Sequence, residues 1–166
     1  MPPEPWLRGP IAGIDPWLLP AAHAFVQAGE ELARAADGLS LEQLWARPGS
    51  AASVAFHIRH TAGATDRLLS YARGEALSES QKQAAAAEAQ DLPRFEAAPL
   101  LAELTAAFER ARVQLLTTPR ERLLEPRGVG RAQLPSNVLG LLFHAAEHAQ
   151  RHAGQAVTTA KILRGL

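Results

Sequence analysis

Four long stretches of the chain carry apolar residues at the spacing of an α-helix, and prolines or glycines separate them. Side chains three and four residues apart lie on the same face of a helix, so each stretch has one apolar face that must be buried. Alanine and leucine dominate these stretches, and aromatic residues make up only 5% of the chain. The pattern therefore predicts an all-α fold in which four amphipathic helices pack as a four-helix bundle.

Local signals set the expected limits of the helices. Ser40 and Gln43 have the spacing of a capping box, so a short helix is expected there, ending before Pro48. Gly74 is a typical residue at which to end the second long helix. The four long helices are expected at residues 16–36, 53–73, 98–117 and 136–163.

The connection over residues 75–97 is long enough to cross over between the second and third helices. Ser78 and Gln81 repeat the capping-box spacing, which leaves two interpretations open: a helical turn or two outside the bundle, or a flexible alanine-rich loop. The later segment TTPRERLLEPRGVGRAQLP is expected to be a loop, and the sequence shows no strand pattern. Without a domain boundary or an internal repeat, residues 1–166 are expected to form one domain.

Charge and cysteine content narrow the classes of function. The 17 basic and 17 acidic residues cancel, so neither nucleic acid nor a membrane is expected as a partner. The chain has no cysteine, which excludes disulfides, thiol nucleophiles and thiolate zinc sites. The start MPPEPWLRGPIAGIDP does not resemble a signal peptide, and the apolar run AQLPSNVLGLLFHAA is too short to span a bilayer. A cytoplasmic protein is therefore expected.

The fourth predicted helix carries three of the six histidines, in the segment HAAEHAQRHAGQ. On a helical wheel, His148 and His152 lie in the apolar stripe and His144 lies at its edge. A buried ring nitrogen without a partner costs about 1–3 kcal/mol, and a divalent metal ion shared by both rings would be such a partner. The pair alone leaves open the alternative of two hydrogen-bonded core histidines.

The second predicted helix contains His57 and His60, in the segment FHIRH. Both lie on or beside its buried arc, and the wheel places His57 more centrally. Histidines from two helices thus face the interior, which favours a metal site. Three imidazoles leave coordination positions open for water or substrate, as catalytic metals require. The ligand type suits zinc, nickel, iron or copper, and zinc or nickel is the expected ion.

Two segments, SVAFHIRHTAGATDRLL and HAAEHAQRHAGQAV, resemble the second and fourth helices of the DinB/YfiT-like family of metal-dependent four-helix-bundle proteins. The second of them is similar to the family's HxxxHRGQ pattern, from which Ala153 departs because the family usually has Arg there. The resemblance implies an up-down-down-up bundle and three ligands, His60, His148 and His152. His57 is kept as an alternate ligand or a neighbour of one.

The resemblance also implies an activity and its partners. The chain would be a metal-dependent hydrolase or a thiol-dependent S-transferase that acts on a small-molecule substrate, with an external low-molecular-weight thiol as a further cofactor. It would form a homodimer. Phe143 and Leu139 lie away from the buried arc, which leaves two interpretations open: a contact between helix faces of two subunits, or packing on another helix of the same bundle. A non-catalytic, metal-stabilised binding or stress-associated protein is the alternative.

Three further residues lie on the helices that carry the predicted site. Arg67 faces its metal side and either holds an anionic substrate group or is a surface side chain. Gln155 either binds near the metal or is a plain polar residue. Glu147 points away and is expected to pair with Arg151. No general base is evident beside the histidines.

Overall fold

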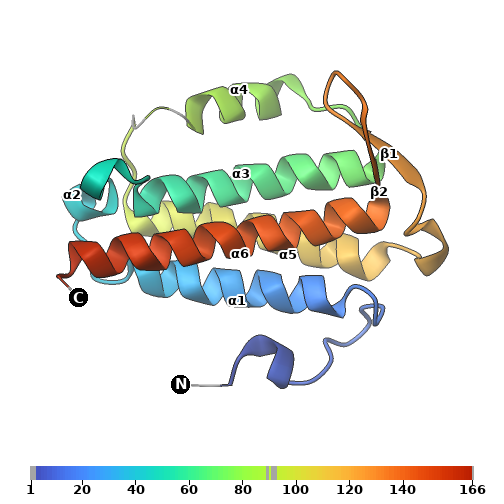
Figure 1. Ribbon diagram of the computed structural model, residues 1–166, viewed down its shortest axis with the longest axis horizontal. Helices are drawn as coiled ribbons and strands as arrows, with labels where there is room; N and C mark the ends of the chain where they lie inside the picture. The colour runs from blue at the N-terminus through green and yellow to red at the C-terminus, as the bar shows by residue number, and fades with distance from the viewer. Residues whose placement is uncertain (1–2, 89, 91–92, 166) are drawn as a thin grey trace.

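The computed structural model describes residues 3–88, 90 and 93–165. Its four long helices lie side by side (Figure 1). The α6 and α5 helices each pack against both α1 and α3. Figure 1 shows α1 and α6 running in one direction and α3 and α5 in the other. The four helices are α1 (Leu19–Ala36), α3 (Val54–Arg73), α5 (Ala97–Thr117) and α6 (Val138–Leu163).

Helix ends follow local hydrogen bonds. The Ser53 hydroxyl accepts the backbone N–H of Phe56 at the start of α3, and Gly74 ends that helix in the left-handed conformation with φ of +84°. The short helix α2 (Leu41–Leu44) has the predicted capping box. The first helix was expected from residue 16 but begins at Leu19, because the Asp15 carboxylate accepts the backbone N–H of Trp17 and holds a turn there.

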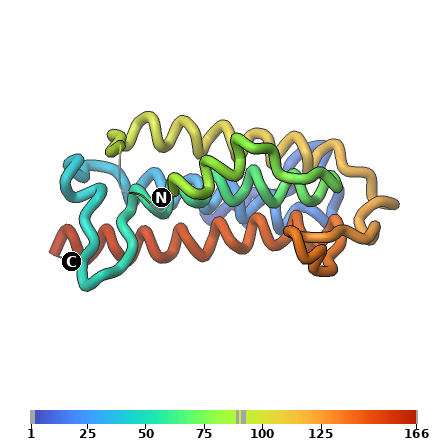
Figure 2. The backbone as a smooth tube through the Cα atoms, turned by 90° about the horizontal axis from the view of Figure 1, so that it is seen from above, coloured from blue at the N-terminus to red at the C-terminus, as the bar shows by residue number. Residues whose placement is uncertain are grey.

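The long connection contains a helix, α4 (Glu79–Glu88), so the helical interpretation holds for these residues. Ser78 and Gln81 form the expected reciprocal hydrogen bonds at its start. The Gln81 amide also donates to the Asp66 carboxylate and the Ser70 hydroxyl of α3. These bonds fasten the first turn of α4 along the outer side of α3, where Figures 1 and 2 both show it.

The expectation of a strand-free loop before the last helix is wrong. Strands β1 (Pro126–Val129) and β2 (Leu134–Asn137) form an antiparallel hairpin, in which Val129 is opposite Leu134. Each strand contains a proline, which would break a ladder in a larger sheet but is tolerated where each strand has a free edge. The described residues are thus mostly helical with one small sheet, and three short 3₁₀ segments complete them: Pro5–Leu7, Pro48–Ser50 and Arg120–Arg122.

The core lies between the four long helices. Leucines from three of them, Leu32, Leu104 and Leu142, are fully buried. Small residues line much of α6, and Ala153 belongs to this buried set, which explains why an arginine would not fit at its position. Within the described part of the chain, none of the helices combines the length and the apolar character needed to cross a membrane.

Candidate metal centre

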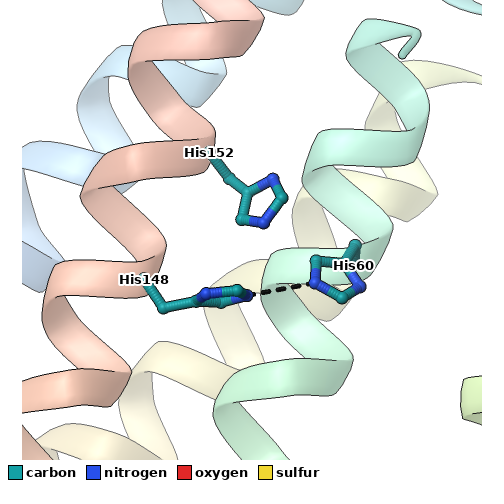
Figure 3. Close-up of side chains that lie close together, drawn as sticks. All are labelled: His60, His148 and His152. Carbon is teal, nitrogen blue, oxygen red and sulfur yellow. Dashed lines mark hydrogen bonds between the residues drawn. The ribbon is translucent and has the colours of Figure 1, made fainter.

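Three histidines converge between α3 and α6. The rings of His60, His148 and His152 point toward one another (Figure 3), and one donor nitrogen of each lies within 4.8 Å of those of the other two. The Nε2 atoms of His60 and His148 are 3.0 Å apart. Zinc–imidazole bonds of about 2.0–2.1 Å place the nitrogens of a shared site roughly 3–4 Å apart. The three side chains therefore have the separation at which one divalent ion could be held.

The backbone explains this convergence. His148 and His152 are one turn apart on α6, so their side chains leave the same face of the helix. α3 packs directly against that helix, and it presents His60 on the facing side. Both helices begin at a side-chain cap, Ser53 for α3 and Asn137 for α6. These caps fix where each helix starts, and therefore which residues fall at the level of the site.

The Nδ1 atoms of the three converging histidines have different surroundings. Nδ1 of His152 is 2.9 Å from Nδ1 of His57, and Nδ1 of His60 is 2.8 Å from the Glu88 carboxylate. Nδ1 of His148 is buried and has no hydrogen-bond partner among the described residues. The structure thus places His60 in the group of three, and His57 behind His152.

Two of the three converging histidines, His148 and His152, are held in the neutral form. Burial lowers the pKa of His148 to about 4 and that of His152 to about 3, and the neighbouring His60 adds to both effects. Burial and His60 also lower the pKa of His57 to about 4. Neutral imidazole is the form that binds a metal. The donor set therefore fits a divalent ion, and two of its three rings are in the metal-binding form at neutral pH.

Sequence reasoning missed Glu88, the last residue of α4. Its side chain is only 7% exposed, and its carboxylate accepts hydrogen bonds from His60 and from both terminal nitrogens of Arg67. Burial acts to raise the pKa of Glu88, but these hydrogen bonds outweigh it and lower the pKa below its usual value. The only sequence signal was a single acidic residue at the end of an alanine run, which does not reveal what it faces.

The position of Glu88 changes two expectations from the sequence, one about an acidic group at the site and one about Arg67. An acidic group does lie beside the histidines, although none was evident in the sequence. Arg67 is neither a surface side chain nor a free anion-binding group: its side chain is 15% exposed and its guanidinium is paired with Glu88.

The remaining polar candidates lie outside the group of three. Glu147 pairs with Arg151, as expected. The half-exposed side chain of His144 approaches the Glu147 carboxylate at 3.3 Å. Gln155 is exposed and lines, together with His57 and Arg151, an open pocket of about 520 Å³. This pocket lies within a turn of His152 along α6 and is a candidate space for a small molecule.

These observations define the class of protein. It is a helical protein with a cluster of three histidines between two of its helices. The sequence profile of the DinB superfamily matches residues 24–156, which include all three histidines. The chain therefore belongs to the DinB superfamily.

A solved structure supports the fold. The crystal structure of a conserved protein from Enterococcus faecalis is similar with a TM-score of 0.71 and 19% sequence identity, over 90% of this chain and 98% of that one. At this identity the likeness concerns the fold alone. No curated protein matches the chain in sequence.

Proposed function

We propose that this protein is a metal-dependent enzyme, a hydrolase or a thiol-dependent S-transferase, in which His60, His148 and His152 hold one divalent ion. The convergence of three imidazoles between α3 and α6 carries the proposal. Superfamily membership supports it, because the family resemblance implies the same three ligands. Zinc or nickel is the proposed ion. We also assign the four long helices to an up-down-down-up four-helix bundle forming a single domain.

The side chains of the site determine what such an ion could do. An ion with three protein ligands keeps open positions, where it could polarise a carbonyl group or lower the pKa of bound water toward about 7. His60 is 23% exposed, so solvent reaches the site. His57 lines the adjacent pocket and also contacts His152, which links the pocket wall to the proposed ligand set. Because the chain has no cysteine, an S-transferase would need an external thiol.

A non-catalytic role is the second candidate. The three histidines come from two different helices, so a bound ion would also cross-link α3 and α6 and stabilise the fold. The partial exposure of the site favours the catalytic candidate, since a purely structural ion is usually enclosed by four protein ligands.

Metal analysis of protein purified without an affinity tag tests the proposal. We expect about one equivalent of zinc or nickel in the wild type, and none in His148→Ala. His23→Ala is the matched control, because His23 contacts the Gly9 carbonyl and lies outside the group of three. A wild type that takes up neither ion from micromolar solutions would refute the metal site.

Activity distinguishes the two candidates. Metal-loaded protein is assayed for hydrolysis of small esters and amides, and for transfer of small thiols to an electrophile. Turnover that disappears in His148→Ala supports the enzyme. Bound metal that raises the melting temperature without any turnover supports the structural role.

The partners and location remain proposals. We propose a homodimer with a small-molecule substrate, without nucleic acid or membrane as partners, in the cytoplasm. Phe143 is 58% exposed and is available for such a contact, whereas Leu139 packs partly against the chain's own core. Light scattering on the purified protein measures the oligomeric state directly.

A further inference from the structure

Glu88 is unusual among the residues of α4. It is the buried residue of a helix that otherwise exposes most of its side chains and contains four consecutive alanines. Burying a carboxylate is costly unless charged or hydrogen-bonding partners compensate for it. Both partners, His60 and Arg67, come from α3. The end of α4 is therefore held at one defined place, next to one of the three converging histidines.

α3 is shaped to receive this carboxylate. Gly63 lies between His60 and Arg67 on the same face of the helix. A Cβ atom at Gly63 would collide with Oε1 of Glu88 and would lie 2.9 Å from a terminal nitrogen of Arg67. Glycine within a helix costs about 1 kcal/mol relative to alanine. Its presence here is explained by the space that the carboxylate occupies.

We propose that Glu88 is a positioning residue that orients His60 as a metal ligand. This inference rests on the proposed metal site and adds a function for α4. The Glu88 carboxylate is paired with Arg67 and accepts hydrogen bonds, so Nδ1 of His60, which faces it, carries a proton and donates. The lone pair then lies on Nε2, the nitrogen that faces His148.

The contact has two further effects on the ligand. It fixes the rotation of the His60 ring, and the negative charge makes the imidazole a stronger donor to a metal. Arg67 contributes by binding both carboxylate oxygens, which holds Glu88 ionised and in one orientation. Glu88 itself contacts the outer nitrogen of His60, on the side away from the other two histidines, so its position is that of a support and not of a fourth ligand.

The same hydrogen bond couples the metal to α4. If docked Glu88 strengthens metal binding, bound metal must strengthen the docking of Glu88 by the same free energy. We therefore expect zinc to slow amide hydrogen exchange in the last turn of α4 in the wild type. This slowing should be absent in Glu88→Ala.

Zinc affinity tests the proposal, measured by competition with a chromophoric chelator below the melting temperature of each variant. We expect Glu88→Ala to weaken zinc binding about 10- to 100-fold, the usual effect of losing such a partner. Glu88→Gln keeps an acceptor oxygen and should recover part of the loss. Glu79→Ala is the matched control, because Glu79 lies on the same helix, is exposed and, among the described residues, pairs with Lys82 and not with the site.

The proton position on His60 is the second readout, measured by nitrogen-15 NMR of the imidazoles. In the metal-free and zinc-loaded wild type we expect the proton on Nδ1, and in Glu88→Ala a mixture of the two tautomers in the metal-free form. A merely structural contribution of Glu88 would lower the melting temperature but leave both the tautomer and the zinc affinity of the folded protein unchanged. Should Glu88→Ala fail to fold, Glu88→Gln and Gly63→Ala provide the same comparison.

The outcomes separate this inference from the proposed function. Unchanged zinc affinity and an unchanged tautomer in Glu88→Ala would overturn the role of Glu88 while leaving the three-histidine site intact. A carboxylate oxygen in the zinc coordination shell, seen by X-ray absorption and lost in Glu88→Ala, would make Glu88 a ligand and also overturn it. A wild type that binds no zinc would remove both proposals.

Discussion

The substitution Gly63→Ala should destabilise the protein, although alanine normally favours a helix. Gly63 has ordinary helical backbone within α3, so helix propensity alone predicts a gain of about 1 kcal/mol. The new Cβ would, however, clash with Oε1 of Glu88. The buried carboxylate would have to shift away from Arg67, and its hydrogen bonds to that charged group would be lost.

The magnitude follows from these opposing effects. Hydrogen bonds to charged groups contribute about 1.5–3 kcal/mol each, and Arg67 is mostly buried, so solvent compensates for only part of the loss. After the gain in helix propensity is subtracted from this loss, we expect the free energy of unfolding to fall by about 1–3 kcal/mol. For a chain of this length this corresponds to a melting temperature lower by roughly 2–12 °C.

A second glycine provides the matched control. Gly154 lies within α6, and a Cβ atom there would meet no atom within 4 Å. Gly154→Ala should therefore stabilise the protein by up to about 1 kcal/mol. The assay is urea unfolding followed by circular dichroism, in chelator at pH 7.5 so that metal does not contribute. If both substitutions stabilise the protein equally, Gly63 does not make room for Glu88 and the reasoning fails.

Three further predictions concern pH, the core and the metal. Since the pKa values of His57 and His148 are lowered to about 4 and that of His152 to about 3, the unfolded chain binds protons below about pH 6.5 that the folded chain does not. The stability of the metal-free protein should therefore be constant above pH 7 and fall as the pH drops toward 4. A midpoint of urea unfolding at pH 5 that equals or exceeds the midpoint at pH 7.5 would contradict this. Leu142→Ala should lower the free energy of unfolding by about 2–5 kcal/mol, because Leu142 is 0% exposed. The neighbouring Phe143 is 58% exposed, so Phe143→Ala should change that free energy by about 0.5 kcal/mol or less. Similar losses of stability in both variants would mean that α6 is rotated differently. Free zinc at 100 times its dissociation constant should add about 2.7 kcal/mol to the stability of the wild type, measured as a shift in melting temperature, and an equal shift in His148→Ala would show that zinc binds elsewhere.

Interactions within a few residues were visible in the sequence. The capping boxes at Ser40 and Ser78 and the terminal Gly74 mark where helices begin and end, because they act on backbone groups of the same turn. The spacing of His148 and His152 placed both on one face of α6 for the same reason. The helical character of the chain and two of the three histidines of the candidate site follow from such local rules.

Rules based on neighbouring residues failed where the same short sequence pattern is compatible with more than one structure. The hairpin of β1 and β2 was missed because its prolines and glycines resemble those of an irregular loop, and only the pairing across the turn distinguishes the two. The first helix begins later than expected because Asp15 holds a turn before it. The spacing of apolar residues gives no sign of this turn.

The tertiary structure decided the rest of the site. His57 and His60 lie three residues apart on one helix. The packing of α3 on α6 determines that His60 joins the group of three while His57 contacts His152. The pairing of Glu88 with Arg67 likewise depends on how α4 docks on α3. Sequence spacing fixes which side chains share a helix face, but the rotation of one helix against another and the path of a long connection depend on packing among residues far apart in the chain.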